Sequence, residues 1–101
     1  MRARLSADAP KVAVLTPMAL VMGARAGLSI EQIDDLTMAI ELLAAHGTGE
    51  MGAEFRAGQG RLDLFVSDVD GAWLAQRRSM LSTLVSEIEE DSGGLTLRIG
   101  V

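Results

Sequence analysis

Three residues of this chain carry side chains that could perform catalysis or hold a ligand: Glu41, His46 and Asp68. Glu41 could act as a general base if a pocket tuned its pKa, although an acid on a helix is more often solvated. His46 could bind a metal ion, although a single histidine near a helix C-terminus more often complements the negative helix end. Asp68 carries a carboxylate that could bind a ligand, or it could cap the helix that follows it. These residues can act together only if the fold brings them into one pocket.

The composition of the 101 residues excludes several classes of protein. The net charge of −5 disfavours a nucleic-acid binder, which would display clustered Lys and Arg side chains. The absence of cysteine excludes disulfides and thiolate metal sites. The longest apolar stretch, Met18–Met22, is far too short for a membrane span, and no apolar segment of a signal peptide is visible. We therefore expect one cytoplasmic domain, residues 1–101, that binds neither nucleic acid nor membrane.

A first helix is predicted over residues 10–26, after a short strand at residues 2–6. Asp8 is the candidate N-cap, and Pro10 suits the first turn. Pro17 lies inside the pattern and predicts a kink or a break, because it removes a backbone donor. Gly27 suits the left-handed position that ends a helix. The apolar stripe of this helix comprises Val12, Leu15, Ala19 and Met22, widened by Val14 and Val21.

A second helix begins at Ser29 and ends near Gly47. Ser29 and Gln32 have the spacing of a capping box, in which each side chain binds the backbone N–H of the other residue. The predicted buried face consists of Ile33, Leu36, Ile40 and Leu43.

The rest of the chain is dominated by strand periodicity. Alternating apolar residues predict strands at residues 51–56, 61–66 and 95–101, with a hairpin loop at Gly58–Gly60 and a helix at Trp73–Leu84. Val85–Glu90 is ambiguous, since its apolar residues continue the helical spacing while the following loop suits a hairpin. The order predicts a two-layer α+β sandwich: a mixed, largely antiparallel sheet of four to five strands with three helices on one face.

The helix–turn–helix portion, ending in EQIDDLTMAIELLAAHG, resembles a known family. It is similar to the serine kinases that act as anti-sigma factors, of the RsbW and SpoIIAB type, in the histidine-kinase-like (Bergerat) ATPase superfamily. The later segments VSDVDG and GGLTLRI resemble the second nucleotide motif and the closing strand of that family. The resemblance covers nearly the whole chain and implies a single ATPase-like domain.

The residues that carry the family's chemistry are not kept in register. Its second helix has the motif D-L-x-L-A-V-x-E-A-x-x-N, in which Glu activates the attacking group and Asn holds magnesium. Without gaps, the Glu position is Leu42 and the Asn position is His46. Glu41 comes one residue early, which rotates it by about 100° and predicts that it points away from the pocket. A slip by one residue restores Glu41 but places Ala45 at the Asn position.

The second motif of the family, D-x-G-x-G, is also incomplete. Asp68 occupies the position that contacts adenine, but Asp70 occupies the first glycine position and Gly71 falls between the two. The family then has a glycine-rich lid over the phosphates, where this chain has a predicted helix. The resemblance therefore implies a degenerate domain that lacks the ATP lid.

The helix face that would line the nucleotide cavity of a relative is mostly apolar: Met38, Leu42, Ala45 and His46. Such a cavity would be filled by neighbouring side chains, for example Trp73 or Phe65, or would bind an apolar group. Met38 and Met80, with Met18 and Met22, could form an adaptable binding surface or fill the core.

The resemblance implies a non-catalytic protein-binding module in bacterial partner-switching signalling, with no cofactor and no metal. Its partners would be a sigma factor, an antagonist protein, a related kinase or a second copy of itself. One alternative is a divergent ATP- and magnesium-dependent serine kinase, which would need Glu41 and Asp68 in one pocket. Another is a small-ligand sensor that uses the apolar cavity.

Overall fold

The computed structural model describes residues 1–45, 49–69, 71–91 and 94–100. The elements follow the order β1, α1, α2, β2, β3, α3, β4 and β5. Their bounds are Arg2–Leu5 (β1), Lys11–Ala26 (α1), Ile30–Ala45 (α2), Met51–Ala57 (β2), Arg61–Ser67 (β3), Gly71–Leu84 (α3), Glu87–Asp91 (β4) and Gly94–Gly100 (β5).

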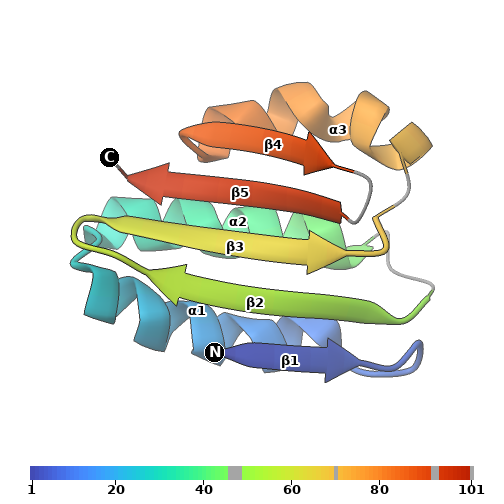
Figure 1. Cartoon of the computed structure of the whole chain (residues 1–101), viewed down its shortest axis with the longest axis horizontal. Helices are drawn as coiled ribbons and strands as arrows, with labels where there is room; N and C mark the ends of the chain where they lie inside the picture. Colours follow the sequence, from blue (N-terminus) through green and yellow to red (C-terminus); the bar gives the residue numbers. More distant parts are fainter. Residues whose placement is uncertain (46–48, 70, 92–93, 101) are drawn as a thin grey trace.

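The strands form one sheet in the order β1-β2-β3-β5-β4, and each of the four neighbouring pairs is antiparallel. The three helices lie together behind the sheet in Figure 1, which leaves the other sheet face uncovered by the described elements. This arrangement confirms the two-layer α+β fold class. No helix among the described residues is long and apolar enough to cross a membrane.

The core lies between the sheet and the helices and is mainly aliphatic. Every second residue of the three central strands points into it, because side chains alternate across a strand. These inward residues are Met51, Ala53, Phe55, Leu62, Leu64, Val66, Leu95, Leu97 and Ile99. The helices close the core with Leu15, Ala19, Leu36, Ala39, Ile40, Leu74 and Leu81.

The turn between α1 and α2 follows the sequence prediction. Gly27 has φ +75°, and the N–H of Leu28 donates to the carbonyl oxygen of Gly23 at 3.0 Å, which closes α1 as a Schellman-type cap. The Ser29 N–H donates to Gln32 Oε1 at 2.8 Å, and the Gln32 N–H donates to Ser29 Oγ at 3.1 Å. The predicted capping box is therefore confirmed.

Two expectations for α1 are wrong, and a third is answered in part. The N-cap is Pro10, not Asp8, and no side chain caps this end. Of the kink or break predicted at Pro17, the break is absent, since the helix continues past this exposed residue. Val12 and Val21 are exposed by 37% and 46%, because α1 buries a narrower stripe than the predicted one.

The ambiguous segment Val85–Glu90 is resolved in favour of a strand. The helix α3 ends at Leu84, and β4 begins at Glu87 and pairs with β5. Val85 and Ile88 pack against the core, whereas Glu87 and Glu89 are exposed. The helical spacing of the apolar residues therefore favoured the wrong element. An edge strand with a single inward apolar residue shows almost no alternation of apolar and polar residues.

Candidate functional site

The candidate site is a groove on the helix layer, and α2 supplies one wall. The capping box fixes where α2 starts, and Leu36, Ile40 and Leu43 bury one of its faces in the core. The neighbouring face of α2 lies outside the core, because its residues are rotated by about 100° or more around the helix axis from the buried ones. This second face carries Met38, Glu41 and Leu42.

The helix α3 supplies the other wall. Trp73, Leu74 and Leu81 are the buried residues of this helix and hold it against the core. Apart from its alanines, its remaining surface is polar in sequence, except where Met80 and Leu84 follow one another at a spacing of four residues. The side of α3 that faces α2 therefore carries an apolar stripe with Ser79 and Thr83 beside it.

The two walls enclose a groove of about 590 Å³. Its lining is Met38, Glu41, Leu42, Ser79, Met80, Thr83 and Leu84. Met38 is 52% exposed and Met80 is 50% exposed, so each keeps about half of its surface in contact with solvent. The arrangement is an open apolar channel with a polar margin, and a volume in this range can hold a drug-sized ligand or a side-chain cluster of a partner.

The groove contains part of the region that the motif comparison identified. Leu42, the ungapped Glu position, lies in it, and Glu41 lines it as well. The prediction that Glu41 points away from a nucleotide pocket stays a prediction, because the groove shares no lining residue with the hollow that Asp68 borders. The side chain of Ala45 and the whole of His46 lie outside the described residues.

Asp68 lies at a different place. Its Oδ2 is 3.4 Å from a guanidinium nitrogen of Arg4 and 3.4 Å from Ser67 Oγ. It has φ +64°, a left-handed conformation that aspartate tolerates better than most residues, and it terminates β3. Asp68 borders a hollow with Val69, Gly71 and Leu74 that has no lining residue in common with the α2–α3 groove.

The nucleotide-site candidates are thus not brought together in the described part of the chain. Glu41 lines the groove, whereas Asp68 is paired with Arg4 and lines another hollow. Gly71 begins α3, and the position of Asp70 is outside the described residues. The described residues contain no group of three or more carboxylate or histidine side chains placed to hold a metal ion.

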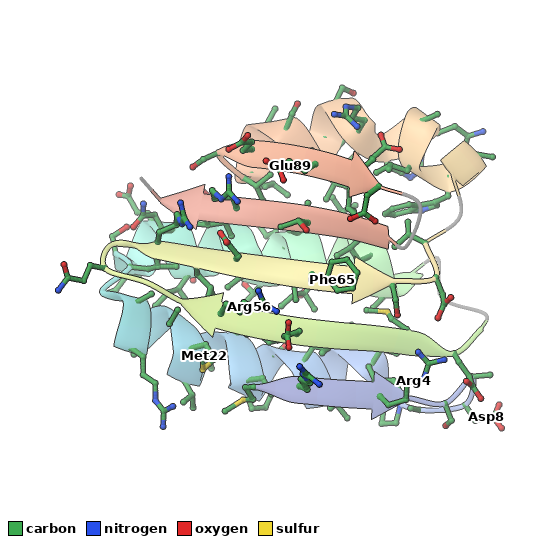
Figure 2. The ribbon with its side chains drawn as sticks, viewed as in Figure 1. Arg4, Asp8, Met22, Arg56, Phe65 and Glu89 are labelled. Carbon is green, nitrogen blue, oxygen red and sulfur yellow. The ribbon has the colours of Figure 1, made fainter. Side chains whose placement is uncertain are left out.

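The expected filling of the cavity by aromatic side chains is not seen. Trp73 is buried in the core near the start of α3 and does not line the groove. Phe65 points to the opposite face of the sheet, because it alternates with the inward residues Leu64 and Val66 (Figure 2). The apolar lining therefore remains available to an external group.

Several ion pairs between charged side chains lie away from the groove, on the open sheet face. Glu54 accepts from Arg2 at 2.5 Å and from Arg56 at 2.9 Å. The hydrogen bond from Arg2, with the one from Arg56, lowers the pKa of the Glu54 carboxyl below its ordinary value. Arg98 donates to Asp63 at 3.0 Å and to Glu87 at 2.8 Å, and these bonds raise the pKa of its guanidinium.

The open sheet face agrees with the sequence, since Arg61, Asp63 and Phe65 alternate with the inward residues of β3. Sequence reasoning missed one wall of the groove. The sequence predicts Met80 as a possible binding residue. Its position beside Leu84 and across the groove from Met38 depends on how α3 packs on α2. Only the tertiary structure supplies that relationship.

Comparison with known proteins adds no assignment to this geometry. No protein-family model and no curated protein matches the chain.

Proposed function

We propose that this protein is a non-catalytic regulatory module that binds an apolar segment of another protein in the groove between α2 and α3. The observation that carries the proposal is the half-exposed pair Met38 and Met80 on opposite walls of an apolar groove. An exposed cluster of flexible thioether side chains is typical of surfaces that accommodate a partner's apolar residues. The shape, a channel between two helices, suits a segment that presents apolar side chains along one face.

The chemistry of the groove disfavours a nucleotide. Phosphates require cationic side chains, backbone N–H groups at a glycine-rich loop, or a bound metal ion. Among the described residues that line the groove there is no cation, and the one charged group among them is the carboxylate of Glu41, which would repel a phosphate. The divergent kinase therefore stays the weaker alternative, since Glu41 and Asp68 line separate hollows.

The class of partner rests on the family resemblance of the sequence. A scaffold similar to an anti-sigma factor, with its nucleotide motifs out of register, suits a role in bacterial partner-switching signalling in the cytoplasm. The partner would then be a sigma factor, an antagonist protein or a related kinase. Its groove-binding segment would carry apolar residues at helical spacing, and a basic residue beside them would complement Glu41.

The proposal is tested by affinity capture followed by a direct binding measurement. The immobilised protein, its Met38→Glu/Met80→Glu variant and an Ile30→Glu control are exposed to lysate of the native host. Ile30 is 80% exposed at the start of α2 and outside the groove, so the control also replaces an exposed apolar residue by Glu. A captured protein is then purified and titrated calorimetrically.

The expected result is a regulatory protein that binds the unmodified chain and the Ile30→Glu control equally. Its affinity for the groove variant should fall at least about tenfold, since two apolar anchors are replaced by charges. Equal binding to all three proteins would contradict the proposal, as would saturable binding of ATP and magnesium to the groove.

A further inference from the structure

The helix α1 is apolar on all sides over most of its length. Its residues 12–24 include no charged side chain, and Thr16 is the one polar residue among them. One side of the helix packs into the core, whereas the opposite side is exposed. A helix that is apolar all round normally lies buried, and a surface helix normally carries polar residues on its outer side. The outer side of α1 therefore has the composition of a covered surface.

This outer side, called the α1 face below, consists of the exposed residues between the two charged ends of the helix: Val12, Ala13, Pro17, Leu20, Val21 and Ala24. The largest side chain among them, Leu20, is 49% exposed, and the neighbouring Val21 is 46% exposed. Ala13, Pro17, Leu20 and Ala24 follow one another at spacings of three or four residues, so they form a row about 16 Å long. The α1 face is therefore a continuous strip rather than a set of scattered apolar residues.

The neighbouring helix α2 borders this face with negative charge. The helices α1 and α2 lie side by side and run in opposite directions (Figure 1). A Cβ on Gly23 of α1 would lie 2.9 Å from Ile33, so Ile33 marks the side of α2 that touches α1. Thr37 lies one turn further on that side, and its neighbours on the outer surface are Asp34 and Glu41. Both acids are exposed, and Glu41 lies between the α1 face and the α2–α3 groove, which it also lines.

The carboxylates of α2 have no cation of their own chain beside them. The helix has four acidic residues and no basic one: Glu31, Asp34, Asp35 and Glu41. None of the four forms an ion pair with another described residue. On the open sheet face, by contrast, Glu54, Asp63 and Glu87 each accept a hydrogen bond from an arginine of the same chain. The negative charge beside the α1 face is therefore available to a cation of another molecule.

We infer that the α1 face binds an amphipathic, positively charged helix of another protein. Apolar side chains of this helix cover Leu20 and Val21, and its basic side chains pair with Asp34 and Glu41. The two acids are seven residues apart, which corresponds to about 10.5 Å along α2. Two turns of a helix have nearly the same length, so the partner helix should carry Lys or Arg at positions i and i+7 beside its apolar side.

The charges argue against two other occupants of this surface. A second copy of the chain would bring the same four carboxylates of α2 with it, and Arg25 is the one exposed basic residue of these two described helices. A bilayer surface attracts helices that carry Lys and Arg beside their apolar side, whereas α2 presents acids there. The inference does not rest on the proposed function, because no residue of the α1 face lines the α2–α3 groove.

The test uses two synthetic helical peptides. The basic peptide has leucines along one side and Lys at positions i and i+7 beside them, and the acidic peptide has Glu in place of both Lys. The proteins are the unmodified chain, Leu20→Gln/Val21→Gln, Asp34→Lys, and the groove variant Met38→Gln/Met80→Gln as the matched control. Fluorescence polarisation measures binding up to about 1 mM protein, at low and at high salt.

The unmodified chain should bind the basic peptide at least about tenfold more tightly than the acidic one, and salt should reduce the difference. Leu20→Gln/Val21→Gln should weaken binding of the basic peptide at least about tenfold, because two apolar contacts are lost. The groove variant should bind the basic peptide as the unmodified chain does. Asp34→Lys should weaken binding of the basic peptide and strengthen binding of the acidic one, a reversal that partial unfolding would not produce.

Equal affinity for the two peptides, or no binding of the basic peptide, would overturn the inference. A groove variant that loses binding while Leu20→Gln/Val21→Gln keeps it would overturn it as well, and would place the peptide in the groove. Sedimentation of the protein alone and flotation with neutral and anionic phospholipid vesicles test the other occupants. Self-association or vesicle binding that Leu20→Gln/Val21→Gln abolishes would also contradict the inference; melting curves confirm that each variant is folded.

Discussion

Met38 of α2 and Met80 of α3 line the same groove, and each leaves half of its surface exposed to solvent. Both helices place other apolar side chains in the core, and neither methionine is part of it. Burying these two side chains against another molecule would therefore release free energy. This relationship connects the fold to the proposed role in binding a protein.

The first prediction concerns nucleotides. Adding ATP and magnesium should leave the melting temperature of the protein unchanged. A ligand present at 100 times its dissociation constant would add roughly 2.7 kcal/mol to the stability of the folded state, which a thermal melt resolves easily. Magnesium with a non-hydrolysable analogue serves as the parallel sample. A reproducible upward shift would favour the divergent kinase.

The second prediction concerns the capping box that positions α2. Ser29→Ala removes the acceptor of the Gln32 N–H and should lower the free energy of unfolding by about 1 kcal/mol. Ser82→Ala is the matched control, since the Ser82 hydroxyl donates to the Ser79 carbonyl oxygen on its own exposed helix surface. Urea denaturation of both variants measures the difference. Equal stability of Ser29→Ala and the unmodified chain would show that the capping hydrogen bond does not stabilise the start of α2.

The third prediction concerns the end of β5. Gly100 has φ +94°, and a Cβ there would lie 2.0 Å from the carbonyl oxygen of Gly60. Gly100→Ala should therefore destabilise the fold by about 1–3 kcal/mol, through backbone strain and the clash. Gly71→Ala should be neutral or slightly stabilising, because open space surrounds that position at the start of α3. Urea midpoints that do not separate the two variants would contradict this account.

The fourth prediction concerns acid. Arg2 and Arg56 hold the folded-state pKa of Glu54 below its ordinary value. A group with a lowered folded pKa contributes stability above its unfolded pKa, and loses it as the pH falls through the folded pKa. The Glu54→Gln variant should therefore lose less stability than the unmodified chain between about pH 5 and pH 3. Melting temperatures across this range, at low and high salt, measure the effect; parallel pH profiles would contradict it.

Local signals predicted the turn between α1 and α2 well. Gly27, Ser29 and Gln32 act through their own backbone neighbours, so their structural roles are readable from sequence. The alternating strands were equally clear, because one face of the sheet is fully buried and the other is polar.

The errors arose where tertiary packing overrides local pattern. Val12 and Val21 have apolar side chains but lie beyond the part of α1 that the sheet can cover. The edge strand β4 shows a single inward apolar residue, Ile88, and so resembles a helix end. The groove could be predicted only in part, since Met38 and Leu42 identify one wall while Met80 joins them through the packing of α3 on α2.

The most direct test of the central claim observes the groove itself. The protein is labelled with ¹³C at its methionine methyl groups, and the NMR signals are followed during titration with the captured partner and, separately, with ATP and magnesium. The signals of Met38 and Met80 should shift with the partner and stay still with the nucleotide. Those of the buried Met22 and Met51 should respond to neither. Partner binding that leaves Met38 and Met80 unmoved, or a nucleotide that moves them, would contradict the account.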